Sequence, residues 1–233
     1  MDAMLDTLCS GAREMALELP PERAQKLCDF ARAMLRQNAV MNLTAITQEE
    51  AVAKLHLLDS LTVLKAVDLR GKTAIDIGCG AGFPGVPLAI ACPEAEITLL
   101  DSLGKRMRWL ERELPALGIR AECVTARAEE AAPHYRERFD FALSRAVARL
   151  NILLELCAPF VRPGGAVIAL KGAAAREELV EAARAMQQLG LREEAVLPFQ
   201  IDGAAHHVLI LRKTRPTPML YPRAYAKIKK SPL

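Results

Sequence analysis

The sequence predicts an α/β fold in which a mostly parallel, doubly wound sheet follows a helical N-terminal segment. From residue 72 onward, short β-branched runs alternate with stretches of helical periodicity, which is typical of parallel sheets with crossover helices. Before residue 69 the apolar residues follow helical spacing. The segment 192–213 contains two strand-like runs without an intervening helix, which predicts an antiparallel hairpin at the sheet edge.

The length and composition fit one α/β domain with appended segments. The chain has 233 residues, 52% of them hydrophobic, which is enough for a sizeable core. We expect a helical extension over 1–68, the α/β domain over 69–213 and a basic tail over 214–233. Within the extension, the periodicity predicts helices over 21–38 and 49–67, joined by an irregular connector.

A further predicted helix follows the second strand of the α/β domain. Its basic residues lie on the polar side and are expected to be mainly solvated: Lys105, Arg106, Arg108 and Arg112. Its expected buried stripe consists of Leu103, Met107, Leu110, Leu114 and Leu117.

Several classes of protein are disfavoured by what the sequence lacks. No apolar run approaches the roughly 18 residues of a membrane span, and the N-terminus does not have the pattern of a signal peptide. The six cysteines form no CxxC pair and lie mostly in apolar stretches, as buried thiols of a reducing compartment do. We therefore expect a cytoplasmic protein, a monomer, with no membrane partner and no metal site.

The charge of the chain is divided unevenly. Seven of the 31 basic residues lie between Arg212 and Leu233, where no acidic residue occurs, which leaves 24 basic against 28 acidic residues in the rest. The asymmetry favours a polyanionic partner near the C-terminus. A solvated tail that aids solubility is the equally simple alternative.

The glycine-rich segment "DIGCGAGFPG" (76–85) lies between the first predicted strand and a helix. In a doubly wound sheet this turn binds a nucleotide-like ligand, since glycine allows positive φ and close backbone approach. Asp101 ends the next strand, 19 residues after Gly82. An acid at that spacing can accept hydrogen bonds from ribose hydroxyls.

The turn also matches the GxGxxG pattern of dinucleotide sites, so a nicotinamide cofactor is an alternative. Pro84 and Pro87, however, remove backbone N–H groups that a pyrophosphate would need. Asp76 would repel a pyrophosphate but suits a ligand with an ammonium and a sulfonium group. "DIGCGAG" resembles the first motif of class I S-adenosylmethionine-dependent methyltransferases, and S-adenosylmethionine is the expected cofactor.

The end of the fourth predicted strand, "LSRAVARL", indicates which atom is methylated. It has no [DNS]PP[YF] turn for an exocyclic amine, and the chain has no Pro-Cys pair for carbon 5 of cytosine. Arg145 and Arg149 lie there instead, and arginine stays protonated and cannot act as a base. This favours N7 of guanine, which has a free lone pair, and arginine also pairs with guanine edges or phosphates. A structural ion pair is the alternative explanation of Arg145.

Several motifs resemble those of the bacterial 16S rRNA guanine-N7 methyltransferase family, also called ribosomal small-subunit methyltransferase G or glucose-inhibited division protein B. They run in order from about residue 37 to the end: "NLTAI", "HLLDSL", "DIGCGAGFPGVPLAI", "LLDSLGKRMRWLE", "RAEE", "SRAVARL", "ALKG", "YPR" and "KKSPL". The resemblance implies a seven-stranded class I methyltransferase fold and 16S rRNA or a small ribosomal subunit particle as partner. Loss of this family is linked to low-level streptomycin resistance.

The resemblance also implies roles for individual residues. Gly78 and Phe83, with Asp76, Gly80 and Gly82, would form the first cofactor loop, and Asp101 would hold the ribose. Ala128 and Glu129 follow the third strand, where such folds contact adenine, although Glu129 could simply cap a helix. Arg145 would lie beside the methyl group as the catalytic and cofactor-facing arginine. The expected RNA contacts are Arg149, Lys171, Arg223, Lys227, Lys229 and Lys230.

The tail departs from the family pattern. Ala226 and Ile228 occupy positions where glycine and proline are expected, so the tail is freer to form a helix. Three rival functions remain at this point: a methyltransferase acting on a small molecule or protein, a nicotinamide oxidoreductase, and a cofactor-binding protein that has lost catalysis.

Overall fold

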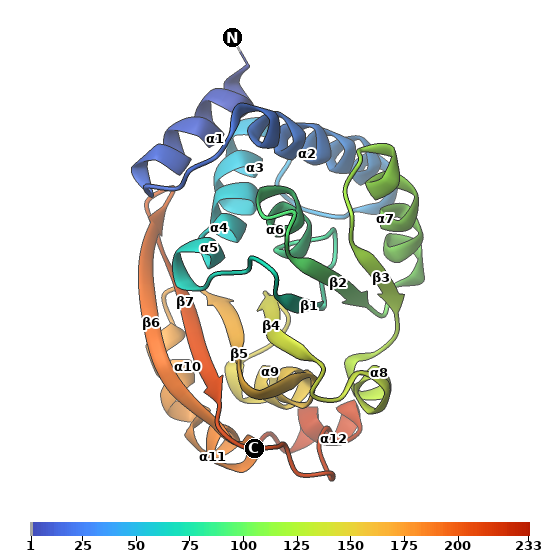
Figure 1. The fold of residues 1–233 in the computed structure, drawn as a ribbon, viewed down its shortest axis with the longest axis vertical. Helices are drawn as coiled ribbons and strands as arrows, with labels where there is room; N and C mark the ends of the chain where they lie inside the picture. The colour runs from blue at the N-terminus through green and yellow to red at the C-terminus, as the bar shows by residue number, and fades with distance from the viewer. Residues whose placement is uncertain (1) are drawn as a thin grey trace.

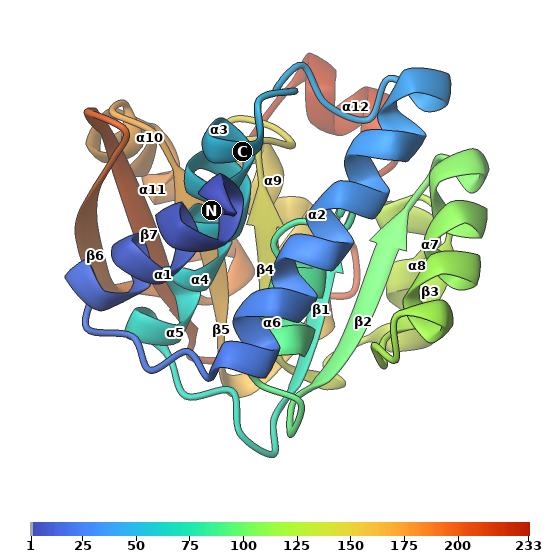
Figure 2. The same ribbon diagram turned by 90° about the horizontal axis from the view of Figure 1, so that it is seen from above.

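The computed structural model describes residues 2–233 and contains one seven-stranded mixed sheet between two layers of helices (Figures 1 and 2). Its strands are β1 (Thr73–Ile77), β2 (Glu96–Asp101), β3 (Glu122–Thr125), β4 (Phe139–Arg145), β5 (Val161–Lys171), β6 (Leu191–Ile201) and β7 (Ala204–Lys213). The strand order is β3-β2-β1-β4-β5-β7-β6. The first five strands are parallel, and the β6–β7 hairpin is antiparallel at the edge. The predicted fold class is thereby confirmed.

The helices separate into two groups that cover opposite faces of the sheet (Figure 1). The apolar core on one face of the sheet, called the first core below, packs against α1 (Ala3–Glu14), α2 (Pro21–Met41), α6 (Gly85–Ala91) and α7 (Gly104–Ala116). The second core packs against α8 (Ala128–Tyr135), α9 (Leu150–Cys157), α10 (Ala175–Glu181), α11 (Ala183–Leu189) and the short 3₁₀ turn η2 (Ala158–Phe160). Buried Met4, Leu8 and Phe30 share the first core with Val86 and Trp109, so the N-terminal helices complete the core of the α/β part.

The helix predicted over 49–67 is interrupted by a π-helical turn. It consists of α3 (Glu49–Val52), the π-turn η1 (Ala53–Leu58), α4 (Asp59–Leu61) and α5 (Val63–Ala66). Such turns recur at functional sites because the extra residue per turn re-aims side chains. The preceding helix α2 continues three residues past its predicted end and stops at Asn42, whose left-handed φ of 50° terminates it.

The predicted buried stripe of the helix after β2 is partly wrong. Met107, Leu110 and Leu114 are buried as expected, but Leu103 precedes α7 and is 50% exposed. Trp109 is buried in the first core instead. A helical wheel assigns the stripe by periodicity alone and does not show that residue 103 lies before the helix.

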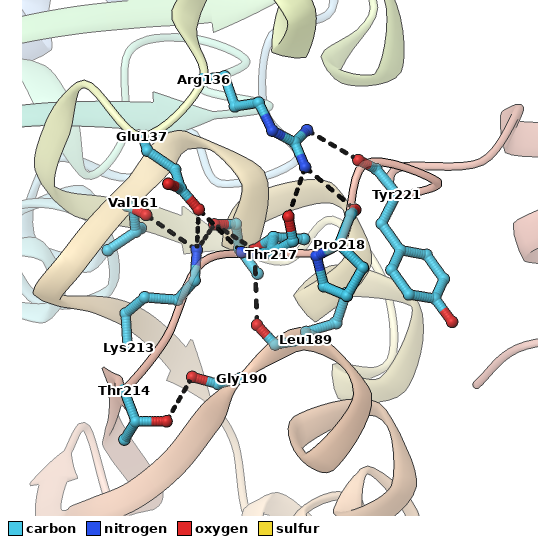
Figure 3. Close-up of polar contacts among 11 residues, drawn as sticks. Arg136, Glu137, Val161, Leu189, Gly190, Lys213, Thr214, Thr217, Pro218 and Tyr221 are labelled. Atoms are coloured by element: carbon cyan, nitrogen blue, oxygen red, sulfur yellow. Dashed lines mark hydrogen bonds and ion pairs between the residues drawn. The ribbon is translucent and has the colours of Figure 1, made fainter.

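The segment after β7 is anchored to the second helical layer by a buried polar cluster (Figure 3). Arg136 donates to the carbonyl oxygens of Thr217, Pro218 and Tyr221 at 2.7–3.0 Å. Glu137 accepts from the backbone N–H of Thr217 at 2.8 Å and from Lys213 Nζ at 3.2 Å. The tail then forms the short helix α12 (Tyr225–Lys230), which contains Ala226 and Ile228.

Candidate functional site

The sheet topology places a crevice where the strand order reverses, between β1 and β4. From β1 the chain moves outward to β2 and β3, and β4 then adds on the other side of β1. Ligands of doubly wound sheets bind at this switch point, beyond the carboxyl ends of the strands. The glycine-rich turn follows β1, and Arg145 is the last residue of β4. The two motifs that the sequence separates by some sixty residues therefore lie side by side.

Asp101 fastens the glycine-rich turn to the end of β2. Its Oδ2 accepts from the backbone N–H of Gly80 at 2.9 Å, and its Oδ1 accepts from that of Leu103 at 2.8 Å. Each carboxylate oxygen has two lone pairs, so both oxygens keep the capacity to accept a further hydrogen bond. Asp101 therefore holds the turn in place and can also accept a hydrogen bond from a ligand at the mouth of the crevice.

Asp76 lies beneath the turn and is fully buried. Its Oδ2 accepts from the N–H of Gly85, at the start of α6, at 2.7 Å. Its Oδ1 has no hydrogen-bond partner among residues 2–233, and burial raises the pKa of the carboxyl to about 7. A β-carbon on Gly85 would lie 2.4 Å from a Leu99 methyl, so only glycine allows α6 to pack this closely on β2.

A cavity of about 310 Å³ opens beside the turn at the carboxyl ends of β1 and β2. Four of the predicted cofactor residues line it: Gly78, Asp101, Ala128 and Glu129. Its wall also includes Leu103, Arg127, Val147 and Tyr225. The other predicted residues of the turn (Asp76, Gly80, Gly82 and Phe83) lie outside this lining and form the turn and its base.

Arg145 is held by the π-helical segment of the N-terminal extension. Its Nη1 donates to the carbonyl oxygen of Leu55 at 2.8 Å and to Asp59 Oδ2 at 2.9 Å. Its guanidinium carbon lies 5.2 Å from the centre of the Phe83 ring, within the range of a cation–π contact. Only 16% of the side chain is exposed, so the guanidinium has one fixed position at the crevice.

His56 completes the support of Arg145 on the other side. Its ring stacks on Phe83 with the centroids 4.8 Å apart, and its Nδ1 lies 3.1 Å from Arg145 Nη2. Since arginine only donates, Nδ1 accepts, and the imidazole hydrogen is on Nε2, 2.8 Å from the hydroxyl of Thr44. Burial, aided by the charge of Arg145, lowers the pKa of His56 to about 4, so the ring is neutral at pH 7.

Asp59 joins Arg145 to the edge hairpin. Its Oδ1 pairs with His206 Nδ1 of β7 at 2.9 Å, while its Oδ2 pairs with Arg145. Burial opposes ionisation of Asp59, but the hydrogen bond from His206 and the charge of Arg145 outweigh it and keep its pKa below the usual range. The same hydrogen bond raises the pKa of His206.

A second cavity, of about 630 Å³, lies over this network. It is lined by Ile46, His56, Asp59, Arg145, Val147, Lys171, Gly172 and His206, among others. Val147 belongs to both cavities, so they meet at this side chain. Gly78 has a left-handed φ of 73°, and a β-carbon there would lie 2.6 Å from a Val147 methyl. The glycine therefore allows the loop after β4 to close onto the turn after β1.

The predicted RNA contacts fall into two groups. Lys171 and Arg223 are engaged inside the protein: Lys171 Nζ donates to Ala148 O and Glu178, and Arg223 pairs with buried Glu155. Arg149 is 58% exposed and pairs with Glu181. Lys227, Lys229 and Lys230 are exposed on α12, and none of the three pairs with an acidic group in the described part of the chain.

Sequence reasoning assigned no role to His56, Asp59 or His206. The spacing of His56 and Asp59 was a usable signal, because residues three apart on a helix share one face. No comparable signal exists for His206, which is 147 residues from Asp59 in the sequence.

Within residues 2–233, no three His, Cys, Asp or Glu side chains are grouped so that they could hold a metal ion. None of the described helices is both long and apolar enough to cross a membrane. A cavity of about 1040 Å³ opens at the amino ends of β2 and β3, away from the switch point.

Solved structures with a similar fold include several methyltransferases. A SAM-dependent methyltransferase from Aquifex aeolicus matches 69% of this chain and 92% of its own, with a TM-score of 0.53 and 18% identity. A precorrin-6y C5,15-methyltransferase from Geobacter metallireducens matches 72% of this chain and 90% of its own, with a TM-score of 0.52 and 15% identity. At these identities the likeness concerns the fold alone.

Sequence relatives give a closer assignment. A protein of Alkaliphilus oremlandii, named ribosomal RNA small subunit methyltransferase G, is 41% identical over 98% of this chain and 98% of its own. A protein of the same name from Pelotomaculum thermopropionicum is 38% identical over the whole of both chains. The family model for rRNA small subunit methyltransferase G matches residues 23–208. The chain therefore belongs to the rRNA small subunit methyltransferase G family.

Proposed function

We propose that this protein transfers a methyl group from S-adenosylmethionine to N7 of a guanine in 16S rRNA of the small ribosomal subunit. The observation that supports it most strongly is the meeting of two cavities at Val147: one lined by the glycine turn and Asp101, the other by Arg145. A methyl donor and an acceptor base need such adjacent sites. The names of the relatives supply the class of acceptor, ribosomal RNA of the small subunit.

The residues of the smaller cavity fit S-adenosylmethionine. Asp101 has acceptor capacity for ribose hydroxyls, and Glu129 and the backbone at Ala128 lie where an adenine edge would be contacted. Below the turn, the unpartnered Oδ1 of Asp76 gives the site negative character when ionised. That character suits a cationic ligand and disfavours a pyrophosphate. When bound, S-adenosylmethionine supplies an electrophilic methyl group on a sulfonium.

No general base is required in the proposed reaction. N7 of guanine has a lone pair and no proton to lose, so the protein must orient the base and exclude water. Three of the five N–H donors of Arg145 are engaged by Leu55, Asp59 and His56. The remaining two are available for guanine O6 or a phosphate oxygen. Arg145 would thus position the acceptor.

The experiment that tests this function is methyl transfer from labelled S-adenosylmethionine to small-subunit particles lacking the modification, with naked 16S rRNA in parallel. Digestion to nucleosides identifies the labelled base, and we expect 7-methylguanosine. Label in another nucleoside would retain the rRNA substrate but reject N7. Label absent from both RNAs, with cofactor binding intact, would redirect the search to a small-molecule or protein acceptor.

A further inference from the structure

The C-terminal helix forms part of the wall of the smaller cavity. Tyr225, the first residue of α12, lines this cavity together with Gly78, Asp101 and Glu129. In the sequence, Tyr225 follows the nearest other residue of the lining, Leu156, by 69 residues. Among the described residues that line the cavity, Tyr225 is the only aromatic one.

The tail that supplies Tyr225 is firmly docked. Arg223 makes a two-pronged ion pair with Glu155 of α9, at 2.6 and 2.8 Å, and the side chain of Glu155 has no exposed surface. Ile228 is fully buried in the second core, which places the other side of α12 against α9. Figure 1 shows α12 beside α8 and α9. The segment between β7 and α12 is held by the polar cluster of Figure 3.

Tyr225 is also tied to the predicted adenine contacts. The guanidinium carbon of Arg127 lies 4.5 Å from the centre of the Tyr225 ring, and Arg127 Nε donates to Glu129 at 3.0 Å. Glu129, Arg127 and Tyr225 therefore form one connected group. A cation over an aromatic face restrains the ring, so Tyr225 presents a defined surface to the cavity.

We propose that Tyr225 is a specificity-determining residue that closes the cofactor pocket over the adenosine part of the ligand. Every nucleobase has a π-face that stacks on aromatic side chains, and the rest of the lining near it is aliphatic or charged. In this proposal α12 forms part of the cofactor site, and the same helix contains the exposed lysines. This inference rests on the proposed function, because it takes the ligand of this cavity to be S-adenosylmethionine.

The test compares the full-length protein with Tyr225→Leu and Tyr225→Phe by calorimetric titration with S-adenosylhomocysteine and with 5′-methylthioadenosine. Leucine keeps the apolar contact of the tail but removes the ring, whereas phenylalanine keeps the ring. We expect Tyr225→Leu to raise Kd about tenfold for both ligands, within the range for stacking on one base. Tyr225→Phe should stay within about twofold. Both ligands should respond, because 5′-methylthioadenosine keeps the adenosine but lacks the amino-acid part.

The matched control is Ala226→Gln, which changes an exposed residue one position further along the same helix. Its Kd for both ligands should equal that of the unaltered protein, and thermal unfolding of all variants should coincide. Unchanged affinity in Tyr225→Leu, or a loss confined to the ligand with the amino-acid part, would overturn the inference. The titrations contain no RNA, so a failure of the proposed rRNA reaction would leave this result unaffected.

Discussion

At the scale of single residues, Arg145 is the point where the N-terminal extension, the sheet and the cavity of about 630 Å³ meet. Its donors are shared between Leu55 O, Asp59 and His56, and its guanidinium carbon lies 5.2 Å from the centre of the Phe83 ring. The position of the guanidinium therefore depends on two parts of the chain, residues 55–59 and the turn that carries Phe83. Both readings of Arg145 left open by the sequence, an ion pair and a substrate contact, are compatible with this one arrangement.

Replacing Arg145 by alanine should lower the turnover of methyl transfer about a hundredfold, since a misplaced acceptor costs roughly that factor. The Kd for S-adenosylmethionine should change little, because Arg145 lines the other cavity. Single-turnover rates with saturating cofactor, together with titration calorimetry, measure the two effects. Asp59→Asn serves as the control: it removes the ion pair but keeps the arginine. Normal turnover in Arg145→Ala would remove it from the proposed mechanism.

His206 gives the site a pH dependence with a definite sign. Its hydrogen bond to Asp59 raises its pKa in the folded protein, so the protonated ring stabilises the fold. The contribution is fully present below the unfolded pKa, about 6.5, and is lost as pH rises through the higher folded value. Other charges that face His206 are Arg145, which opposes protonation, and Asp59 itself.

We expect the free energy of unfolding of the unaltered protein to exceed that of His206→Gln most at low pH. The difference should shrink steadily above pH 6.5. Urea unfolding between pH 5 and 9 measures it, and His207→Gln on the neighbouring, more exposed position is the control. A difference that grows with pH would mean that the ring stabilises the fold in its neutral form.

At the scale of elements, the sequence predicts what local periodicity determines. The alternation after residue 72 predicts the parallel strands, and the absence of a helix within 192–213 predicts the β6–β7 hairpin, both of which are present. The π-turn η1 was not predictable, because its six residues are too few to establish an apolar periodicity of their own within a helical segment. The docking of the tail was not predictable either, since its partners Glu155 and Arg136 lie far away in the sequence.

The junction between β7 and the tail depends on Lys213, whose side chain has no exposed surface. Its ammonium donates to the carbonyl oxygens of Ala158 and Val161, and it pairs with Glu137. Burial outweighs these contacts and lowers the pKa of Lys213 to about 8. Because the unfolded value is near 10.5, the unfolded chain binds more protons between pH 8 and 10.5, and stability from this group rises over that window.

Replacing Lys213 by methionine should abolish that rise. In the unaltered protein, the free energy of unfolding relative to Lys213→Met should increase by about 2–3 kcal/mol between pH 8 and 10.5. Urea unfolding at half-unit steps of pH is the measurement. In Glu137→Gln the rise should begin at lower pH, because the charge that favours protonation of Lys213 is gone. Parallel profiles for all three proteins would show that Lys213 has an ordinary pKa.

At the scale of the whole molecule, the site is produced by topology more than by any one motif. The glycine turn, Asp101 and the residues after β3 were predictable because their spacing follows from the strand order of a doubly wound sheet. Tyr225 and His206 reach the same crevice from the tail and from the edge hairpin, and only the folded chain brings them there. The extension and the tail, which flank the α/β part in the sequence, thus each supply lining residues to one of the two cavities.

This arrangement also separates the charges of the molecule. The exposed lysines of α12 (Lys227, Lys229 and Lys230) lie on the helix that closes the smaller cavity, whereas the chain before Arg212 has 24 basic against 28 acidic residues. If RNA approaches this end of the sheet, each lysine that neutralises a phosphate releases counterions. The slope of log K against log salt then changes by about 0.7–0.9 for each contact.

Replacing all three lysines by glutamine should therefore reduce the salt slope of binding to unmodified small-subunit particles by about 2–3. Filter binding between 50 and 200 mM salt measures the slope. The control replaces Lys26, Arg70 and Lys72 by glutamine, which removes the same charge beside the amino ends of β1 and β3. Equal slopes in the two variants would mean that net charge alone attracts the RNA; a reduced slope only in the α12 variant, with Kd for S-adenosylhomocysteine unchanged, would locate the phosphates at the tail.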